Sequence, residues 1–304
     1  MKLVFMGTPD FAVPALEQLA ARHEVVAVFT QPDKPVGRKQ ILTPPDVKVC
    51  AQKLNIPVCQ PGSMKTDEAQ NQLKSFAPEV IVVAAYGQIL PKAVLDLPKY
   101  GCVNIHGSLL PKYRGASPIQ QAVLNGDRVT GVTTMLMDVG LDTGDILLTR
   151  ETEIGENETA AELFDRLSVL GGELILETLD ALEQGAVTPR KQDEALATHT
   201  SKIDKSYSPI DFTQPASAVH NLIRGLYSWP MATAVIGGKR VKVHKARLSQ
   251  GSGKAGTLLS VKPLVVACGE GAVELLEIQP EGKKKMTAAA FAAGHKLQAG
   301  DNLL

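Results

Sequence analysis

Two polar residues lie two positions apart in the segment Asn104–His106, directly after the short apolar run Gly101–Val103. Because side chains two apart on a β-strand share a face, Asn104 and His106 are expected to point into the same space. The Asn104 amide is a neutral donor, and the His106 imidazole can donate a hydrogen bond or move a proton near neutral pH. A tetrahedral oxyanion needs donors already aimed at it, so this pair is suited to acyl transfer.

A carboxylate on a glycine-flanked loop, Asp142 within Asp138–Gly144, can complete the set. It can orient His106 or hold a water that transfers protons. The sequence has no serine in a nucleophile elbow and no evident Cys/His pair, so a covalent acyl-enzyme is not indicated. We therefore predict that Asn104, His106 and Asp142 serve the direct attack of an amine on a bound acyl donor. Taken singly, each residue has an ordinary alternative role: Asn104 could cap the loop, His106 could be a structural histidine at the strand end, and Asp142 could be a turn residue.

The N-terminal half alternates short apolar runs with amphipathic segments, a pattern typical of a doubly wound, mostly parallel sheet. The predicted strands are Leu3–Met6, Val25–Phe29, Val80–Ala84, Cys102–Ile105, Gly131–Met137 and Asp145–Arg150, and the predicted helices are Pro14–Ala20, Pro45–Leu54, Asp67–Phe76 and Thr159–Gln184. Ligands of such sheets lie beyond the carboxyl ends of the strands, where Asn104–Pro111 falls. The turn at Gly7–Asp10 lacks the G-x-G-x-x-G fingerprint, which argues against a nicotinamide dehydrogenase.

The C-terminal part has a different organisation. Apolar density drops between Gly185 and Pro215, after which a helix is predicted near Ala216–Gly225. Short strands are then predicted at Ala232–Ile236, Arg240–Leu248, Gly256–Val261, Leu264–Ala267 and Val273–Ile278, with Gly237-Gly238 as a hairpin turn. This pattern is compatible with a small OB-like β-barrel. We expect a catalytic domain over residues 1–188, a linker over 189–207 and a basic domain over 208–304.

Charge is distributed unevenly although the whole chain has a net charge of zero. Residues 1–200 carry 18 Lys and Arg against 25 Asp and Glu, a net of −7, and residues 201–304 carry 14 against 7, a net of +7. A basic C-terminal part is suited to contact with phosphates, and ordinary compositional scatter is the alternative.

Longer motifs resemble those of the folate-dependent formyltransferases, and especially the members that act on an aminoacylated tRNA. The segments that carry the resemblance are Gly7–Phe11, Phe29–Asp33, Ala84–Pro91, Asn104–Pro111, Asp138–Gly144 and Asn221–Pro230. The resemblance implies transfer of a formyl group from 10-formyltetrahydrofolate to the amino group of methionine on initiator tRNA. It implies a Rossmann-like catalytic domain, and it places Asn104, His106 and Asp142 on the family's catalytic positions.

The same resemblance suggests binding residues. Ser108, Leu109, Leu110 and Pro111 fall on the family's tetrahydrofolate-binding loop, and Gln88, Ile89 and Leu90 fall on the segment that borders the pterin. A basic loop of the catalytic domain inserts into the tRNA acceptor stem in this family. The residues expected to contact tRNA are Lys34, Arg38 and Lys39 of that loop, with Lys202 and Lys205 of the linker. This chain has Gly37-Arg38-Lys39-Gln40 where a longer Gly-Arg-Gly-Lys-Lys run is common, and Arg38 aligns with the key arginine.

Other features limit the class of protein. No apolar run reaches the ~18 residues of a membrane span, and the N-terminus lacks the features of a secretory signal. The four cysteines show no paired or metal-ligand spacing and are expected to be reduced thiols in a cytoplasmic protein. The protein is expected to be a monomer without a metal ion.

Two alternatives stay open: a formyltransferase for a small amino-sugar or amino-nucleotide acceptor, and a folate- or RNA-binding protein without catalysis. Phe11 is a candidate wall for the methionine side chain.

Overall fold

A seven-stranded sheet organises the first unit of the computed structural model, which describes residues 1–37 and 39–303. Its strand order is β10-β9-β7-β6-β1-β2-β5. The bounds are β1 (Lys2–Gly7), β2 (Glu24–Phe29), β5 (Val58–Cys59), β6 (Val80–Ala84), β7 (Cys102–His106), β9 (Val129–Leu136) and β10 (Ile146–Glu153). The strands β7, β6, β1, β2 and β5, adjacent in that order in the sheet, pair in parallel, and β9 pairs with β7 in the antiparallel direction. The predicted doubly wound, mostly parallel sheet is confirmed.

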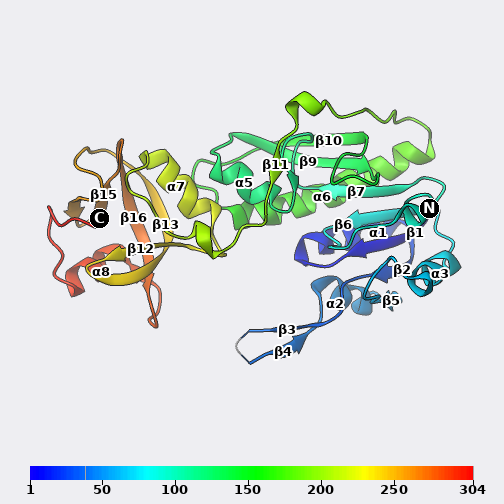
Figure 1. Cartoon of the computed structure of the whole chain (residues 1–304), viewed down its shortest axis with the longest axis horizontal. Coiled ribbons are helices and arrows are strands. Elements are labelled where there is room, and N and C mark those ends of the chain that lie inside the picture. Colours follow the sequence, from blue (N-terminus) through cyan, green and yellow to red (C-terminus); the bar gives the residue numbers. More distant parts are fainter. Residues whose placement is uncertain (38, 304) are drawn as a thin grey trace. The chain divides into compact units, whose positions relative to one another are not determined.

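Helices flank these strands (Figure 1). They are α1 (Val13–Arg22), α2 (Asp46–Lys53), α3 (Asp67–Ser75), α4 (Lys92–Leu95) and α6 (Ala160–Glu183). The strand β6 is buried at every residue, because its continuous apolar sequence is covered on both faces of the sheet. Ile81 and Val83 join a core cluster with Leu73 of α3 and Leu95 of α4. All four cysteines are buried as free thiols, and burial, followed by the charge of Asp96, raises the pKa of Cys102 to about 12.

The second unit contains the predicted C-terminal β-domain. Its antiparallel sheet has the order β12-β13-β16-β15-β14, with β17 paired to β16. The bounds are β12 (Ala232–Ile236), β13 (Lys239–Ser249), β14 (Leu258–Val261), β15 (Leu264–Ala267), β16 (Ala272–Pro280) and β17 (Met286–Thr287), with helices α7 (Ala216–Gly225) and α8 (Ala288–Gly294). The turn between β12 and β13 has positive φ at both Gly237 and Gly238, as the sequence predicted for this hairpin.

Each unit is assembled from separate segments of the chain. The first comprises residues 1–115, 130–152 and 164–200, and the second comprises 116–129, 153–163 and 201–304. The second unit therefore includes helix α5 (Pro118–Leu124), which packs on α7 and which the sequence analysis did not predict. Gly225 permits this approach, because a Cβ there would lie 2.8 Å from the Leu124 side chain.

Several short elements were not predicted. They are the strands β5 and β17, the helices α4 and α8, the paired strands β8 (Arg114–Gly115) and β11 (His199–Thr200), and the 3-10 turns Asp10–Ala12, Glu194–Leu196 and Lys205–Tyr207. The segment predicted as a basic loop with Lys34 and Lys39 also contains strand structure that was not predicted. Strands β3 (Lys34–Val36) and β4 (Ile41–Thr43) form an antiparallel hairpin whose six strand residues are all exposed (Figure 1).

The base of this hairpin is held by the carboxylate of Asp33. Lys48 Nζ lies 2.8 Å from both carboxylate oxygens, and Gln60 Nε2 donates to Oδ1 at 2.7 Å. Gln60 Nε2 also donates to the Gln31 carbonyl at 2.9 Å. The hydrogen bonds to Asp33 hold its pKa below the ordinary value, and the bond from Gln60 has the larger effect, followed by that from Lys48.

We expect the anchor to make stability depend on pH. Because the pKa of Asp33 is lowered on folding, its contribution is present above the unfolded pKa of ~3.9 and is lost as pH falls through the folded value. Thermal unfolding of wild type and Asp33→Asn should differ most at neutral pH and converge in acid. Glu151→Gln, which alters an exposed carboxylate of β10, is the matched control. A difference between wild type and Asp33→Asn that stays constant from pH 7 to pH 3 would contradict this role.

Candidate active site

The strand β7 carries Asn104 and His106 to the carboxyl end of the parallel sheet. In the register of the sheet, Asn104 lies opposite Met135 and His106 opposite Thr133 of β9. The two residues are two positions apart on the strand and therefore share a face. They are 9% and 6% exposed, so each polar group needs a partner in the protein or in a ligand.

One hydrogen bond shows which nitrogen of the His106 ring carries a proton. Its Nε2 lies 2.9 Å from the backbone carbonyl of Tyr113. A carbonyl oxygen only accepts, so Nε2 carries the proton in this contact. In the neutral imidazole the other nitrogen, Nδ1, is then unprotonated and can accept a proton.

The carboxylate of Asp142 faces that free nitrogen. Its Oδ2 lies 3.8 Å from His106 Nδ1, which is longer than a hydrogen bond and leaves the pair in electrostatic contact. The same oxygen accepts a bond from the Gly115 backbone N–H at 2.8 Å. The Asp142 backbone has φ +55°, a left-handed conformation that aspartate tolerates better than most residues. The structure thus brings together two of the predicted catalytic residues and places Asn104 on the His106 face.

The turn after β7 is bonded to its own surroundings more extensively than its sequence suggested. The Thr133 hydroxyl donates to the Ser108 carbonyl at 2.7 Å and accepts from the Leu110 N–H at 3.1 Å. The Pro111 carbonyl accepts from the Thr198 N–H at 3.2 Å, and the Ser108 hydroxyl donates to the Lys112 carbonyl at 2.6 Å. Several groups expected to be open to folate therefore fix the shape of the loop instead.

The segment predicted to border the pterin is divided in the same way. The Gln88 side chain is committed to a neighbouring loop, where it accepts from Met64 N and donates to the Pro61 carbonyl, both at 2.9 Å. Leu90 is 4% exposed and belongs to the core, whereas the Ile89 side chain is 74% exposed. Ile89 is thus the side chain of this segment that remains open to a ligand.

The predicted tRNA contacts lie on the surface where the structure describes them. Lys34 and Lys39 are exposed in the hairpin, and Lys202 and Lys205 are exposed after residue 200. Arg38 lies outside the described residues. Phe11, considered as a wall for methionine, is 7% exposed and packs on Phe164 with ring centroids 5.3 Å apart.

Three residues beside Asp142 were missed by the sequence analysis: Arg114, Gln192 and Glu194. The Arg114 side chain is 2% exposed and bonds to both carboxylate oxygens of Glu194, at 2.9 and 2.7 Å. This bond raises the pKa of Arg114 and lowers that of Glu194. Gln192 donates to the carbonyls of Asp142 and Gly144 at 2.8 Å. No motif pointed to this cluster, since Arg114 lies 78 residues before Gln192 and 80 before Glu194 in the sequence.

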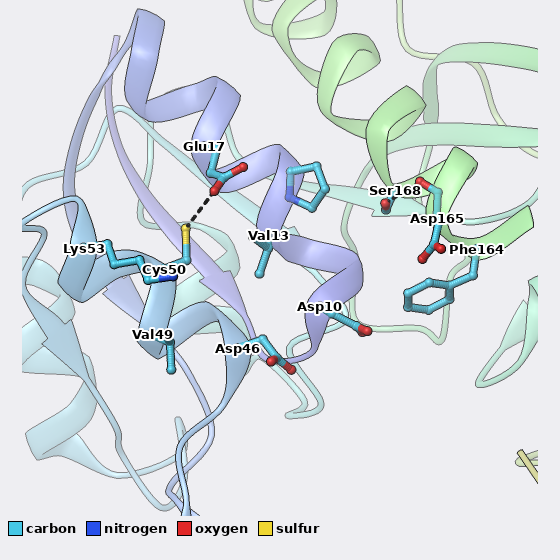
Figure 2. A pocket seen from close by; sticks show the side chains of 11 residues that line it. Asp10, Val13, Glu17, Asp46, Val49, Cys50, Lys53, Phe164, Asp165 and Ser168 are labelled. Carbon is cyan, nitrogen blue, oxygen red and sulfur yellow. Dashed lines mark hydrogen bonds between the residues drawn. The ribbon is translucent and has the colours of Figure 1, made fainter. Parts of the chain in front are cut away.

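A cavity of about 350 Å³ lies elsewhere in the first unit, and none of the three predicted catalytic residues lines it (Figure 2). Its lining includes four carboxylates, from Asp10, Glu17, Asp46 and Asp165. Burial raises the pKa of Asp10 above its ordinary value. A backbone hydrogen bond from Phe11 opposes this shift, and the charges of Asp46 and Asp165 add to it. The carboxylates would repel phosphate and folate anions, so we place neither substrate there.

Among residues 1–37 and 39–303, no group of three or more His, Cys, Asp or Glu side chains is arranged to hold a metal ion. No helix there is long and apolar enough to span a membrane.

Known protein structures share this fold. An N-formyltransferase from Helicobacter canadensis, in complex with folinic acid and dTDP-3-aminofucose, matches with a TM-score of 0.70 and 22% identity, over 92% of this chain and 99% of that one. HypX from Aquifex aeolicus, in complex with tetrahydrofolic acid, matches with a TM-score of 0.65 and 18% identity, over 99% of this chain and 48% of that one. At these identities the likeness concerns the fold.

Sequence comparisons are more specific. Residues 1–179 match the formyl transferase family, and residues 202–296 match the formyl transferase C-terminal domain. The methionyl-tRNA formyltransferase of Citrifermentans bemidjiense is 50% identical over 99% of this chain and 95% of its own length. That of Trichlorobacter lovleyi is 48% identical over 100% and 97%. The chain is therefore an enzyme of the formyl transferase family, and it is similar over its whole length to the methionyl-tRNA formyltransferases.

Proposed function

We propose that this enzyme transfers the formyl group of 10-formyltetrahydrofolate to the α-amine of methionyl initiator tRNA. The observation that carries the chemistry is the meeting of buried His106 with Asp142 beyond the end of β7, on the strand that also bears Asn104. The full-length similarity to methionyl-tRNA formyltransferases supports the acceptor. A small amino-sugar acceptor has support only from fold neighbours at about one-fifth identity.

The reaction exchanges one C–N bond for another. The neutral amine of the methionyl group attacks the formyl carbon, and a tetrahedral intermediate forms with negative charge on its oxygen. The bond to N10 of the folate then breaks, the attacking nitrogen loses a proton, and N10 gains one. The Asn104 amide is a donor for the oxyanion, and it needs no change in protonation to act.

His106 has a more restricted part. Its Nε2–H is committed to the Tyr113 carbonyl, so only Nδ1 is available to the reacting groups. A neutral ring accepts a proton there, whereas donation to the oxyanion requires the imidazolium. The Asp142 carboxylate, 3.8 Å from Nδ1, supplies the counter-charge for that form. A water beside the pair, within hydrogen-bond reach of both Nδ1 and Oδ2, would relay the proton of the amine.

The folate is assigned to the groups around this site that remain free. The exposed Ile89 side chain offers an apolar surface to the pterin. Gln88 orients the segment Gln88–Leu90 through its bonds to Met64 and Pro61. The turn Ser108–Pro111, braced by Thr133, presents a fixed wall. Rigid walls suit a donor whose formyl carbon must be held at a defined place.

The acceptor end of the tRNA is assigned to the β3–β4 hairpin. Lys34 and Lys39 provide positive charge, and Val36, Ile41 and Leu42 are 56%, 61% and 65% exposed. Exposed apolar side chains beside cations can pack against unpaired bases while the lysines contact phosphates. Lys202 and Lys205 add further basic contacts at the start of the C-terminal part.

Asp142→Asn should abolish most of the turnover while the fold persists. The amide is nearly isosteric and can still accept from Gly115, but it has no charge and cannot take up a proton. We expect kcat for formyl-methionyl-tRNA formation to fall by roughly 10²–10⁴-fold. Rapid-quench assays of formyl transfer, with circular dichroism as the folding control, measure this. Near-normal turnover of Asp142→Asn would exclude the proposed role.

The hairpin lysines should act on tRNA affinity. Replacing Lys34 and Lys39 together by alanine should weaken tRNA binding and reduce the log–log salt slope by about 0.7–0.9 for each phosphate that is no longer neutralised. Filter-binding titrations across a range of salt concentrations measure both effects. Lys74→Ala, on the exposed face of α3, is the charge-matched control for one lysine. An unchanged salt slope in the double variant would place the tRNA contact elsewhere.

A further inference from the structure

Both the oxygen and the nitrogen of the Gln192 side-chain amide are hydrogen-bonded beside the loop Asp138–Gly144, called here the Asp142 loop. Its oxygen accepts from Arg114 Nε at 3.0 Å and from Nη2 at 2.9 Å. Its nitrogen donates to the carbonyls of Asp142 and Gly144, each at 2.8 Å. Four bonds fix the amide in one orientation, because the guanidinium presents only donors and the carbonyls present only acceptors.

Arg114 is itself held on every side. It is 2% exposed, and besides Gln192 it binds the Glu194 carboxylate through Nη1 and Nη2. Its backbone N–H donates to the Thr198 carbonyl at 2.8 Å, within the pairing of β8 with β11. The guanidinium therefore cannot turn away from Gln192 without breaking several bonds at once.

These contacts converge on both ends of Asp142. Gln192 holds the backbone carbonyl, and the Gly115 N–H, next to Arg114, holds the carboxylate. The left-handed φ of +55° is a costly conformation for a residue with a side chain, and it persists where surrounding bonds enforce it. The two bonds meet that requirement, and they fix the direction in which the carboxylate faces His106.

We propose that Gln192, oriented by Arg114, is a positioning residue that sets the catalytic geometry of Asp142. The inference rests on the proposed role of Asp142 in formyl transfer. The hydrogen bonds of the Gln192 side chain go to Arg114, to Met135 Sδ and to the carbonyls of Asp142 and Gly144, and none goes to the His106 ring. Its effect therefore passes through the Asp142 loop. Glutamine is required because glutamate would keep the Arg114 contact while placing a carboxylate oxygen against two carbonyl oxygens.

The test is a double-mutant cycle on formyl transfer with methionyl initiator tRNA and 10-formyltetrahydrofolate. Gln192→Glu should lower kcat by roughly 10- to 100-fold, the effect of a misplaced catalytic group. In the Asp142→Asn background the same change should lower kcat no further, because the carboxylate that Gln192 positions is already absent. KM for both substrates should change far less than kcat.

Two further variants separate positioning from folding. Gln192→Met removes the donors without adding a charge, and it should show the same non-additivity even if Gln192→Glu unfolds. Gln184→Glu, an exposed residue near the end of α6, is the matched control for the change of amide to carboxylate. Thermal unfolding of each variant gives its folded fraction.

The outcomes distinguish this inference from the proposed function. A fall of roughly 10²–10⁴-fold in Asp142→Asn that leaves a measurable rate, with equal fold-losses from the Gln192 changes in both backgrounds, would overturn the positioning role alone. Gln192 variants with wild-type kcat would overturn it as well. Near-normal turnover of Asp142→Asn itself would overturn the proposed function on which it rests.

Discussion

A backbone segment of three residues, Tyr113–Gly115, determines how the polar groups at the end of β7 are used. The Tyr113 carbonyl accepts a hydrogen bond from His106 Nε2–H, and the Gly115 N–H donates one to the Asp142 carboxylate. Arg114, between them, binds Gln192 and Glu194 through its side chain. The orientation of the imidazole, and with it the nitrogen left for chemistry, depends on this segment staying in place.

The segment is held in turn by a second strand from far along the chain. Residues Thr198 and Thr200 bond to the backbone of Tyr113 and Arg114, and glycine is needed at 115 because a Cβ there would lie 2.5 Å from the Thr200 carbonyl. The predicted linker of residues 189–207 is therefore more than a connection. Its first part, including Gln192 and Glu194, completes the surroundings of the candidate site.

What the sequence predicted, and what it missed, has a physical explanation. Strands such as Val80–Ala84 were predicted because burial on both faces produces a continuous apolar run. The pairing of β8 with β11 leaves no periodicity, since each strand has two residues and its partner is about 85 positions away. The β3–β4 hairpin was missed for another reason: all its strand residues are exposed, so no alternation of buried and exposed positions marks it. Asn104, His106 and Asp142 were predicted from their chemistry and from the motifs, whereas the contacts of Gln192 are visible only once the chain is folded.

The identity of the acceptor is tested most directly by giving the enzyme several acceptors and comparing the products. The purified enzyme would be given 10-formyltetrahydrofolate with methionyl initiator tRNA, with methionyl elongator tRNA, or with a nucleotide-linked amino sugar, and the formylated product would be identified by mass spectrometry. The account predicts formyl-methionine on the initiator tRNA and little or no product from the other two acceptors. Formylation of the amino sugar, with neither tRNA modified, would contradict it.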